Sequence, residues 1–534
     1  MLRVLEECDR AAVGFAADPV HDLRVTLRRC RSMADGMMAM DPDPSWKAMK
    51  KAGKHLFRSL GELRDVQIMM DWLDQLEPAV EGVAALNQAP GGNAPATTDS
   101  GPEAQPAAVA SVPEVPALAL RQILRARESE QKHTARAALD QFDRKQWRQW
   151  SKSLPQRASH IRPGSAVFRH LALERWTAAR ELHIRAMRNR SQVALHTLRI
   201  GIKRFRYIVE NFLPAEHKLW SNDLKHMQDL LGDVHDLDVL WAAALSCRVF
   251  PDEASRKRWH ARIDEERSKR VEEYRQRTIG SDSLWNVWRA GLPQGAQIQQ
   301  IATRRMKLWA KVLDPDFGHS ERVARFALDL YDGLGAAGLL AAPGDSTNGT
   351  RGNPRSALYL AALLHDVGKS KGKKGHHKES QELITRHGTP LGWDPETMQR
   401  AALIARFHAG ALPGRSHKAL RDLLLPEQKT IIQLAAILRL ANAFDAGHDG
   451  QISRVRIEKI ISPANRNHRR TNGFLRKPPT LGKNEALVIS AEGYVPGSPT
   501  AQTIAAERYL LETVLRRPLI VKAATARPMT QQAG

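Results

Sequence analysis

Apolar residues recur at helical spacing over most of the chain. Leu, Ala, Arg, Glu and Gln dominate residues 1–86 and 118–280, and both stretches lack the alternation of apolar and polar positions that marks strands. Helical patterning resumes after residue 297 and continues to about residue 445. The pattern predicts a mainly α protein.

Breaks in this pattern divide the chain. Residues 87–117 are rich in Pro, Gly, Ala and Ser, so they cannot bury a core and are predicted to form a flexible insert. A second break at 289–297 separates the front half from the rear half, and a glycine-rich loop covers 341–354. Residues 486–493 and 517–523 are strand-like and surround a helical segment at 505–515, which predicts a small α+β appendage.

The front half contains an internal repeat. The segment VHDLRVTLRRCRS at 20–32 matches LHTLRIGIKRFRY at 195–207, and KHLFRSLGELRDVQ at 54–67 matches KHMQDLLGDVHDLD at 225–238. The offsets are 175 and 171 residues, so both order and spacing are kept. Because chance rarely repeats two motifs in one order, we predict two related helical bundles.

The first motif places like charges on one helix face. At 100° per residue, a histidine and three cations form one stripe in each copy: His21, Arg24, Arg28 and Arg31, and then His196, Arg199, Lys203 and Arg206. Like charges on one face repel each other, a cost that is explained if the face meets an anionic chain. Arginine forks bind phosphate oxygens in pairs. Internal neutralisation, for example by Asp65 and Asp236, is the alternative.

The overall charge also indicates a polyanionic partner. The 534 residues include 81 Lys+Arg against 58 Asp+Glu, a formal net charge of +23. Nucleic acid, anionic lipid and polyphosphate all fit such an excess. Recognition of single strands needs stacking aromatics, and the basic motifs contain only Phe205 and Tyr207, with no counterpart in the first copy. Nucleic-acid binding is therefore kept as an alternative.

Membrane and disulfide-rich classes are not indicated. No stretch approaches 18 uninterrupted apolar residues, so we expect no membrane partner. Cys8, Cys30 and Cys247 form no C-x-x-C pair, which suits a reducing cytoplasm.

The paired basic and L-G-[ED]-x-x-D motifs resemble those of the CHAD family, the conserved histidine α-helical domain, over about residues 5–280. The resemblance implies two helical bundles around a basic channel that binds inorganic polyphosphate. The binding residues that it implies are His21, Arg24, Arg28, Arg31, Lys54, His196, Arg199, Lys203, Arg206 and Lys225. Metal chelation by the family's histidines is an older alternative, which the surrounding arginines disfavour.

The rear half carries histidines and acidic residues within helical segments. His365 and Asp366 are adjacent between an apolar run and a Gly-Lys turn. Imidazole and carboxylate groups together suit zinc, iron, manganese or similar cations, and ligands from several helices can converge inside a bundle. The other candidate ligands are His319, His376, His377, His408, Asn442 and Asp445.

This pattern resembles the HD superfamily and, over about residues 300–520, the C-terminal half of the exopolyphosphatase/guanosine-pentaphosphate phosphatase (Ppx/GppA) family. By position, the resemblance implies that His319, His365 and Asp366 bind a divalent cation (Mn, Fe, Zn, Co or Mg). His376 or His377, together with His408, would supply the extra ligands of two-metal variants.

Catalysis would use a metal-activated water next to Asp366, with a second metal, Lys369 or Lys378 stabilising the charge that develops on the phosphoryl oxygens. The five lysines of KSKGKKGHHK (369–378) suit a phosphorylated small molecule or nucleotide.

Two departures from the family pattern limit the expectation. The last aspartate of the pattern falls at Asn442, so either Asp445 substitutes for it or the metal is held weakly. The actin-like ATPase-fold domains of the Ppx/GppA family are absent, and exopolyphosphatase activity is therefore not implied.

We predict a polyphosphate-binding domain at 1–285, a linker at 286–300, an HD-type metal domain at 301–455 and an α+β extension at 456–534. The predicted function joins polyphosphate binding to metal-dependent hydrolysis of a phosphoester or phosphoanhydride, in the cytoplasm or on polyphosphate granules. A non-enzymatic granule scaffold or regulator with a degenerate HD domain is the alternative, and Asn442 favours it.

Overall fold

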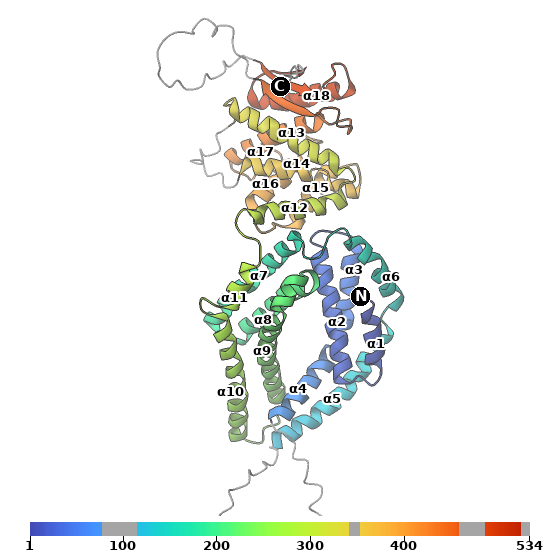
Figure 1. Ribbon diagram of the computed structural model, residues 1–534, viewed down its shortest axis with the longest axis vertical. Helices are drawn as coiled ribbons and strands as arrows, with labels where there is room; N and C mark the ends of the chain where they lie inside the picture. Colours follow the sequence, from blue (N-terminus) through green and yellow to red (C-terminus); the bar gives the residue numbers. More distant parts are fainter. Residues whose placement is uncertain (77–114, 341–352, 459–485, 525–534) are drawn as a thin grey trace, which may run out of the picture. The chain divides into compact units, whose positions relative to one another are not determined.

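The computed structural model describes residues 1–76, 115–340, 353–458 and 486–524. These residues form two compact units: Met1–Ala39 with Asp43–Gln294, and Met40–Pro42 with the described residues from Gly295 onward. They are mainly helical, with one three-stranded sheet near the C-terminus (Figure 1), which confirms the predicted fold class. None of the described helices is long and apolar enough to cross a membrane.

The first unit consists of two groups of helices. The first group comprises α1 (Arg3–Ala12), α2 (Ala17–Met37), α3 (Pro44–Ser59), α4 (Gly61–Leu76), α5 (Val115–Asp140) and α6 (Arg144–Ala158). The second comprises α7 (Ala166–Asn189), α8 (Gln192–Phe212), α9 (Pro214–Ser246), α10 (Glu253–Thr278) and α11 (Leu284–Ala290). The two groups pack together through α2 against α8 and α4 against α9. The repeated motifs therefore meet at the centre of the unit.

The apolar stripes of the repeated motif explain why α2 and α8 pack there. Leu23 and Leu27 of α2 are fully buried, as are Leu198 and Ile202 of α8. Residues three or four positions apart share one face of a helix, so these side chains enter the core together. The basic stripe next to them is thereby fixed in orientation.

The boundaries differ in detail from the sequence-based expectations. Helix α11 continues to Ala290 and α12 begins at Gln297, so the break between them is shorter than the predicted linker at 286–300. Helix α5 begins at Val115, inside the predicted insert at 87–117. Residues 77–114, which include most of that insert, lie outside the described residues. So do residues 341–352 of the glycine-rich loop.

The second unit is a helical core with a small sheet. Its elements are α12 (Gln297–Leu313), α13 (Phe317–Ala336), α14 (Pro354–Leu364), η3 (Val367–Lys371), α15 (His376–His387), α16 (Pro395–Arg406), α17 (Leu425–Ala443), β1 (Arg454–Glu458), β2 (Leu487–Glu492), α18 (Pro499–Leu515) and β3 (Leu519–Ala523). Most residues of helices α14 and α17 are buried, and these two helices form the centre of the core, packing against α13 and α16.

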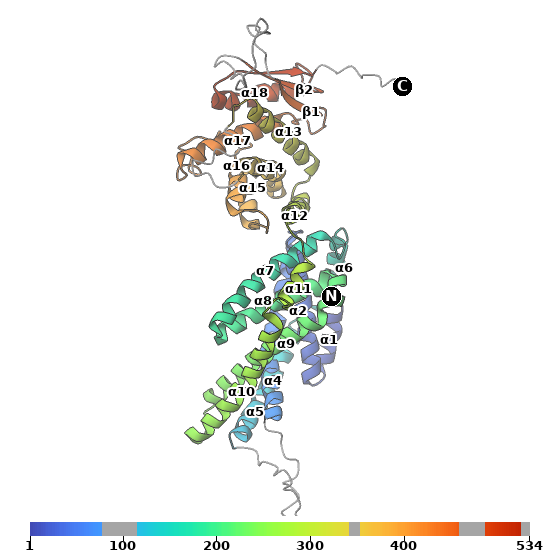
Figure 2. The ribbon, with the colours of Figure 1, turned by 60° about the vertical axis from the view of Figure 1, so that its left-hand side comes forward.

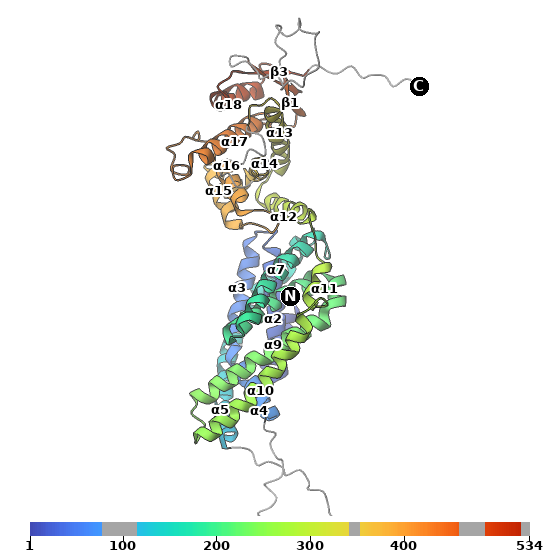
Figure 3. The same cartoon turned by 90° about the vertical axis from the view of Figure 1, so that its left-hand side faces the viewer.

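The sheet has the order β1-β2-β3. Strand β2 pairs antiparallel with β1, where Val455 faces Ala491, and parallel with β3, where Ile489 faces Val521. A parallel pair needs a crossover, and α18 provides it. In Figures 2 and 3, α18 lies beside the sheet, and it packs directly on α17. The strands at 486–493 and 517–523 were expected from the sequence, whereas β1 was not singled out.

Candidate functional site

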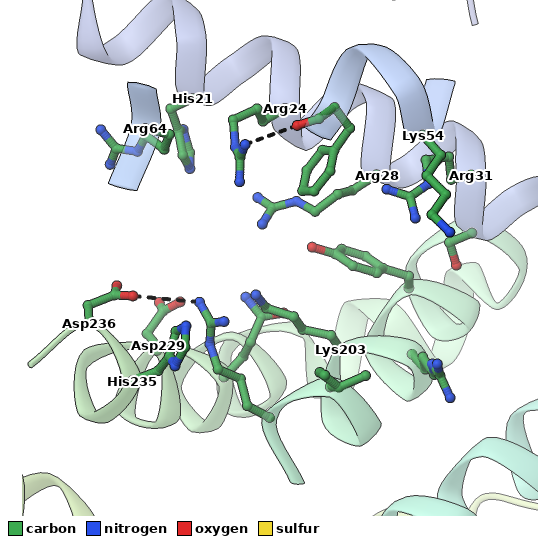
Figure 4. A pocket seen from close by; sticks show the side chains of 18 of the residues that line it. His21, Arg24, Arg28, Arg31, Lys54, Arg64, Lys203, Asp229, His235 and Asp236 are labelled. Carbon is green, nitrogen blue, oxygen red and sulfur yellow. Dashed lines mark hydrogen bonds and ion pairs between the residues drawn. The ribbon is translucent and has the colours of Figure 1, made fainter. Parts of the chain in front are cut away.

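A cavity of about 940 Å³ lies in the first unit, between α2–α4 and α7–α9 (Figure 4). Among its described lining residues, arginines and lysines outnumber aspartates two to one. The cations are Arg24, Arg28, Arg31, Lys50, Lys54, Arg64, Arg175, Arg199, Lys203 and Arg204, and the anions are Asp35, Asp65, Asp229, Asp233 and Asp236. His21, His235, Phe57 and Tyr207 also line this space, which we call the basic cavity.

The two copies of the basic motif face each other across the basic cavity. Helix α2 contributes its whole predicted stripe, and Lys54 of α3 joins it. From α8, Arg199 and Lys203 line the cavity. The remaining expected residues, His196, Arg206 and the exposed Lys225, are not among the lining residues.

Four cationic residues of the described lining, Lys50, Arg64, Arg175 and Arg204, were not expected, and neither was His235. Arg64 and His235 occupy equivalent positions in the second repeated motif, one residue before Asp65 and Asp236. The repeat itself could therefore have pointed to them. His235 also contacts the expected His196, since their Nδ1 atoms lie 3.2 Å apart. Arg175 and Arg204 enter the cavity from positions that carry no such signal.

One aromatic ring organises the arginines of α2. The guanidinium carbons of Arg24, Arg28 and Arg31 lie 4.2, 5.9 and 5.1 Å from the centre of the Phe57 ring. Arg24 Nη1 also donates a hydrogen bond of 3.1 Å to the carbonyl oxygen of Phe57. Cation–π contacts hold a guanidinium by its face and leave its N–H edge for other partners. Phe57 therefore positions three arginines at one wall.

Acidic residues neutralise the basic cavity only in part. Arg199 Nη2 lies 4.0 Å from Asp236 Oδ1, a weak ion pair. The Nε atoms of Arg28, Arg31 and Arg64, like that of Arg199, are buried and have no hydrogen-bond partner among the described residues. Buried donors of this kind are costly to leave unsatisfied. The arrangement therefore offers donors to an anion.

Burial and neighbouring cations shift the pKa values of two residues that line the basic cavity. Burial, together with Arg199, Arg28 and Arg24, lowers the pKa of Lys203 to about 6. Burial raises the pKa of Asp236 to about 6, although Arg199 and Lys203 oppose that shift. Both groups therefore titrate near neutral pH in the empty cavity, where an added anion would favour the protonated forms.

A second cluster of ionisable residues lies in the second unit, where four segments meet. His319 is in the first turn of α13, His365 and Asp366 directly follow α14, His376 begins α15, and His408 follows α16. All are buried except His376, which is mostly buried. Two groups, His319–His365–Asp366 and Asp366–His376–His408, each place their ligand atoms within 4.8 Å of one another. We call these five residues the histidine cluster.

Asp366 lies at the centre of this cluster. Its Oδ2 is 3.3 Å from Nε2 of His365 and 3.8 Å from Nε2 of His319. Its Oδ1 is 3.3 Å from Nε2 of His376 and 3.5 Å from Nε2 of His408. The carboxylate is therefore shared by both groups, one oxygen for each.

Backbone carbonyls orient three of the imidazoles in the same way. The Nδ1 atoms of His365, His408 and His376 lie 2.7, 2.7 and 2.8 Å from the carbonyl oxygens of Ala362, Ala405 and Lys373. A carbonyl accepts only, so each Nδ1 is the protonated nitrogen. Each Nε2 then points toward the cluster and carries a lone pair when its ring is neutral. Metal-binding histidines are oriented in this manner.

Asp445 orients the fourth imidazole. Its Oδ2 lies 2.7 Å from Nδ1 of His319 and also accepts a hydrogen bond of 2.9 Å from Arg322 Nε. Asn442 lies on the other side of the ring, with Oδ1 2.9 Å from Nε2 of His319. Of the two residues considered for the last ligand, Asn442 thus faces the cluster, and Asp445 contacts the far nitrogen.

The Gly-Lys turn after Asp366 is braced by Ser380. The Ser380 hydroxyl donates to the carbonyl oxygen of His365 at 2.5 Å and accepts from Gly368 N at 2.9 Å. A Cβ at Gly368 would lie 2.0 Å from the carbonyl oxygen of His376, so only glycine fits. Gly368 and Ser380 therefore fix the turn that carries His365 and Asp366.

Two expected residues take other positions. Lys369 forms an ion pair with Asp366 Oδ2 at the edge of the histidine cluster. His377 belongs to neither candidate ligand group among the described residues and packs instead over Gly410, where an added Cβ would lie 2.9 Å from Nε2. Of the neighbouring pair, the structure thus brings His376 into the cluster.

Burial and mutual contact shift the protonation of the cluster. Burial alone would raise the pKa of Asp366, but His365, His376 and His408 hold it well below its usual range. Burial, with His365 nearby, lowers the pKa of His408 well below its ordinary value. Asp366, in turn, raises the pKa of His365 against the effect of burial. The cluster thus joins an anionic carboxylate to several imidazoles, a donor set suited to divalent transition metals.

Two family models match the chain. Residues 1–245 match the CHAD domain, and residues 300–485 match Ppx/GppA phosphatase, domain III. No curated protein matches with significance. The first match holds both copies of the basic motif and ends before α10, and the second holds the whole histidine cluster. The chain is therefore similar to a CHAD domain over residues 1–245 and to domain III of the Ppx/GppA phosphatases over residues 300–485.

Proposed function

We propose that the first unit binds inorganic polyphosphate in the basic cavity. The observation that carries this proposal is the excess of cationic side chains in the cavity lining, ten lysines and arginines against five aspartates among the described residues. A chain of phosphates offers closely spaced oxygens to these side chains from both walls at once. The CHAD match agrees with a phosphate polymer as ligand.

Charge reversal tests the basic cavity directly. Replacing Arg24, Arg28, Arg199 and Lys203 by Glu should abolish binding of long-chain polyphosphate. Affinity of the parent should fall steeply with salt, because released counterions drive the binding. The matched control reverses Arg256, Lys257, Arg277 and Arg3, which lie outside the cavity lining. If the cavity variant binds as tightly as this control, the proposal is wrong.

Nucleic acid is the competing polyanion. The described lining holds two aromatic rings, Phe57 and Tyr207, and the Phe57 ring is already covered by three arginines. Bases need free ring faces for stacking. Polyphosphate should therefore outcompete single-stranded DNA of equal charge by at least about tenfold, roughly 1.4 kcal/mol. A preference for DNA would favour the nucleic-acid alternative.

We further propose that the histidine cluster is a metal-dependent phosphohydrolase centre of the HD type. The carrying observation is the distance of 2.9 Å between Nε2 of His376 and Nε2 of His408. Both rings already donate from Nδ1 to carbonyls, so two lone pairs would face each other. Such a contact is repulsive unless a cation or an extra proton lies between them.

Ligand atoms without a suitable hydrogen-bond partner also support a second cation position. Nε2 of His319 faces Oδ1 of Asn442 at 2.9 Å, and Nε2 of His365 is buried without a hydrogen-bond partner among the described residues. Asp366 would be a ligand residue of both groups. Bound divalent cations would supply Lewis acidity and lower the pKa of a water molecule toward neutrality.

The chain's own residues would then handle the phosphate. Lys369, held by Asp366, would place a positive charge next to the phosphoryl oxygens. Hydrolysis joins the water oxygen to phosphorus and breaks the bond from phosphorus to the leaving oxygen, which takes up a proton. The exposed lysines between η3 and α15 would attract the phosphorylated substrate.

Metal analysis combined with a phosphate-release screen tests the second proposal. We expect the purified protein to carry a transition metal. The double variant His365→Ala with Asp366→Ala should lose both the metal and phosphate release while keeping polyphosphate binding. His387→Ala with Asp332→Ala is the matched control, since neither residue belongs to the cluster. A parent protein that is metal-free and inactive would instead support a scaffold with a degenerate metal domain.

A further inference from the structure

A small pocket opens beside the histidine cluster. Its volume is about 210 Å³, and it is lined by His319 and His408 of the cluster, by Arg439 and Asn442 of α17, and by Thr503 and Glu507 of α18. Helix α18 lies beyond the residues that match domain III, which end at 485. We call this space the side pocket.

The arginine of the side pocket is already committed within the protein. Arg439 is 6% exposed and donates four hydrogen bonds: Nε and Nη2 to the two carboxylate oxygens of Glu507, and Nη1 to the carbonyls of Phe407 and Gly410. It anchors α18 to α17, so it is poorly placed to bind a phosphate. Through these hydrogen bonds, Arg439 holds the Glu507 carboxylate at the wall of the side pocket.

Helix α18 supplies hydrogen-bond acceptors to the side pocket through Thr503 and Glu507. The Thr503 hydroxyl donates to the carbonyl oxygen of Pro499 at 3.1 Å, which leaves its oxygen lone pairs for a ligand. Each Glu507 oxygen accepts one hydrogen bond from Arg439 and can accept another. Glu507, the carboxylate among these lining residues, attracts hydroxyl groups and repels phosphate oxygens that approach it. The volume of the side pocket, about 210 Å³, is below the range of about 300–1,000 Å³ that is usual for drug-sized ligands.

We propose that the side pocket binds the hydroxyl-bearing, sugar-sized part of a phosphomonoester whose phosphate faces the histidine cluster. This inference rests on the proposed hydrolase function and narrows its substrate class. Glu507 and Thr503 accept hydrogen bonds from the substrate hydroxyls and thereby select the ester. Hydrolysis of that ester yields the free alcohol and orthophosphate. The polyphosphate chain is excluded as substrate of this centre, because it would bring further anions to Glu507.

Cobalt-loaded full-length protein provides a readout that does not depend on turnover. Ligands that reach the cluster change the visible absorption of bound Co²⁺, whereas ligands in the basic cavity do not. Ribose 5-phosphate is the hydroxyl-bearing probe, phenyl phosphate is the probe without hydroxyls, and tripolyphosphate is the polyanion. We expect ribose 5-phosphate to give the tightest spectral titration.

Variants of α18 assign the selectivity to individual side chains. Glu507→Gln, which keeps an acceptor for Arg439, should weaken ribose 5-phosphate by about tenfold and phenyl phosphate by less than about twofold. Thr503→Val should weaken ribose 5-phosphate by about threefold. Thr513→Val is the matched control, because Thr513 makes the same bond to its own helix, to Tyr509, and does not line the side pocket.

The outcomes separate this inference from the function on which it rests. Protein that binds no Co²⁺ refutes the metal centre, and the inference falls with it. Protein that binds Co²⁺ and releases phosphate, but responds equally to both esters or loses both equally in Glu507→Gln, refutes the side pocket alone. Selective, Glu507-dependent binding without phosphate release supports the pocket and refutes the hydrolase.

Discussion

Asn442 Oδ1 lies 2.9 Å from Nε2 of His319, the ring nitrogen that also lies 3.8 Å from the Asp366 carboxylate. The Asn442 amide oxygen thus lies where an oxygen ligand would complete the group of His319, His365 and Asp366. Asp445, on the opposite nitrogen, is held by Arg322 and cannot take that place without breaking both contacts. Asn442 is neutral, and it is therefore a weak ligand for a cation at this position.

Asn442→Asp should tighten metal binding by about tenfold, or 1.4 kcal/mol, because it adds an anionic oxygen ligand. The metal-free variant should be less stable than the parent, since the new carboxylate would lie near Asp366. Chelator competition and thermal unfolding with and without metal measure both effects. Asn222→Asp, at an exposed position of α9, is the control. Unchanged metal affinity would count against Asn442 as a ligand position.

Asp445→Asn should weaken metal binding by about 10–100-fold, the usual effect of losing a group that orients a ligand histidine. The amide keeps the size of the side chain but no longer stabilises the Nδ1–H of His319 or pairs with Arg322. The dissociation constant of Co²⁺ measures the effect. Asp449→Asn, at an exposed position four residues further on, should leave the dissociation constant unchanged, and equal losses in both variants would contradict an orienting role for Asp445.

Polyphosphate affinity should fall as pH rises from about 6 to 8. In the empty cavity the pKa of Lys203 is about 6. A bound polyanion raises this pKa, so binding takes up a proton and is favoured at lower pH. Asp236, also with a pKa of about 6, becomes anionic over the same range and repels the polymer. Calorimetry in buffers of different ionisation enthalpy counts the protons.

Lys203→Arg should flatten this pH dependence, because a guanidinium stays protonated throughout the range. The Asp236 contribution should remain in that variant and disappear when Asp236→Asn is added. A parent whose affinity rises with pH, or a double variant with an unchanged slope, would contradict the assignment of proton uptake to these two groups.

Phe57→Leu should weaken polyphosphate binding by several-fold while the unit stays folded. The ring holds Arg24, Arg28 and Arg31 through cation–π contacts, each worth about 0.5–1 kcal/mol at exposed sites. Losing them frees the guanidinium groups to point away from the cavity. Phe15→Leu, which removes a similar contact with Arg136 outside the cavity lining, is the control. Equal affinity of both variants would exclude the positioning role.

The sequence predicted the helical class and the basic stripe on each helix because both depend on local periodicity, whereas a channel between the two bundles was implied only by the resemblance to the CHAD family. The apolar stripe of α2 decides which way Arg24 points, and that stripe is visible in the sequence. The entry of Arg175 and Arg204 depends instead on how α7 and α8 pack, which no local pattern records. The same holds for Phe57, whose partners are three arginines on another helix.

For the histidine cluster, motif spacing identified the residue types but not their roles. His376 and His377 are neighbours in sequence, and the start of α15 decides which of them turns toward Asp366. Asn442 and Asp445 are likewise three residues apart and lie on opposite nitrogens of one imidazole. Thr503 and Glu507 carry no motif, since their importance arises only when α18 packs on α17.

The duplicated motif has a consequence for how a polymer would lie in the basic cavity. Inorganic polyphosphate has no chain direction, since its repeat reads the same from either end. Walls built from two copies of one motif, with Arg24 and Arg28 across from Arg199 and Lys203, offer similar groups to either orientation. A long chain could therefore enter from either end and slide between equivalent registers, and the number of productive encounters would grow with its length.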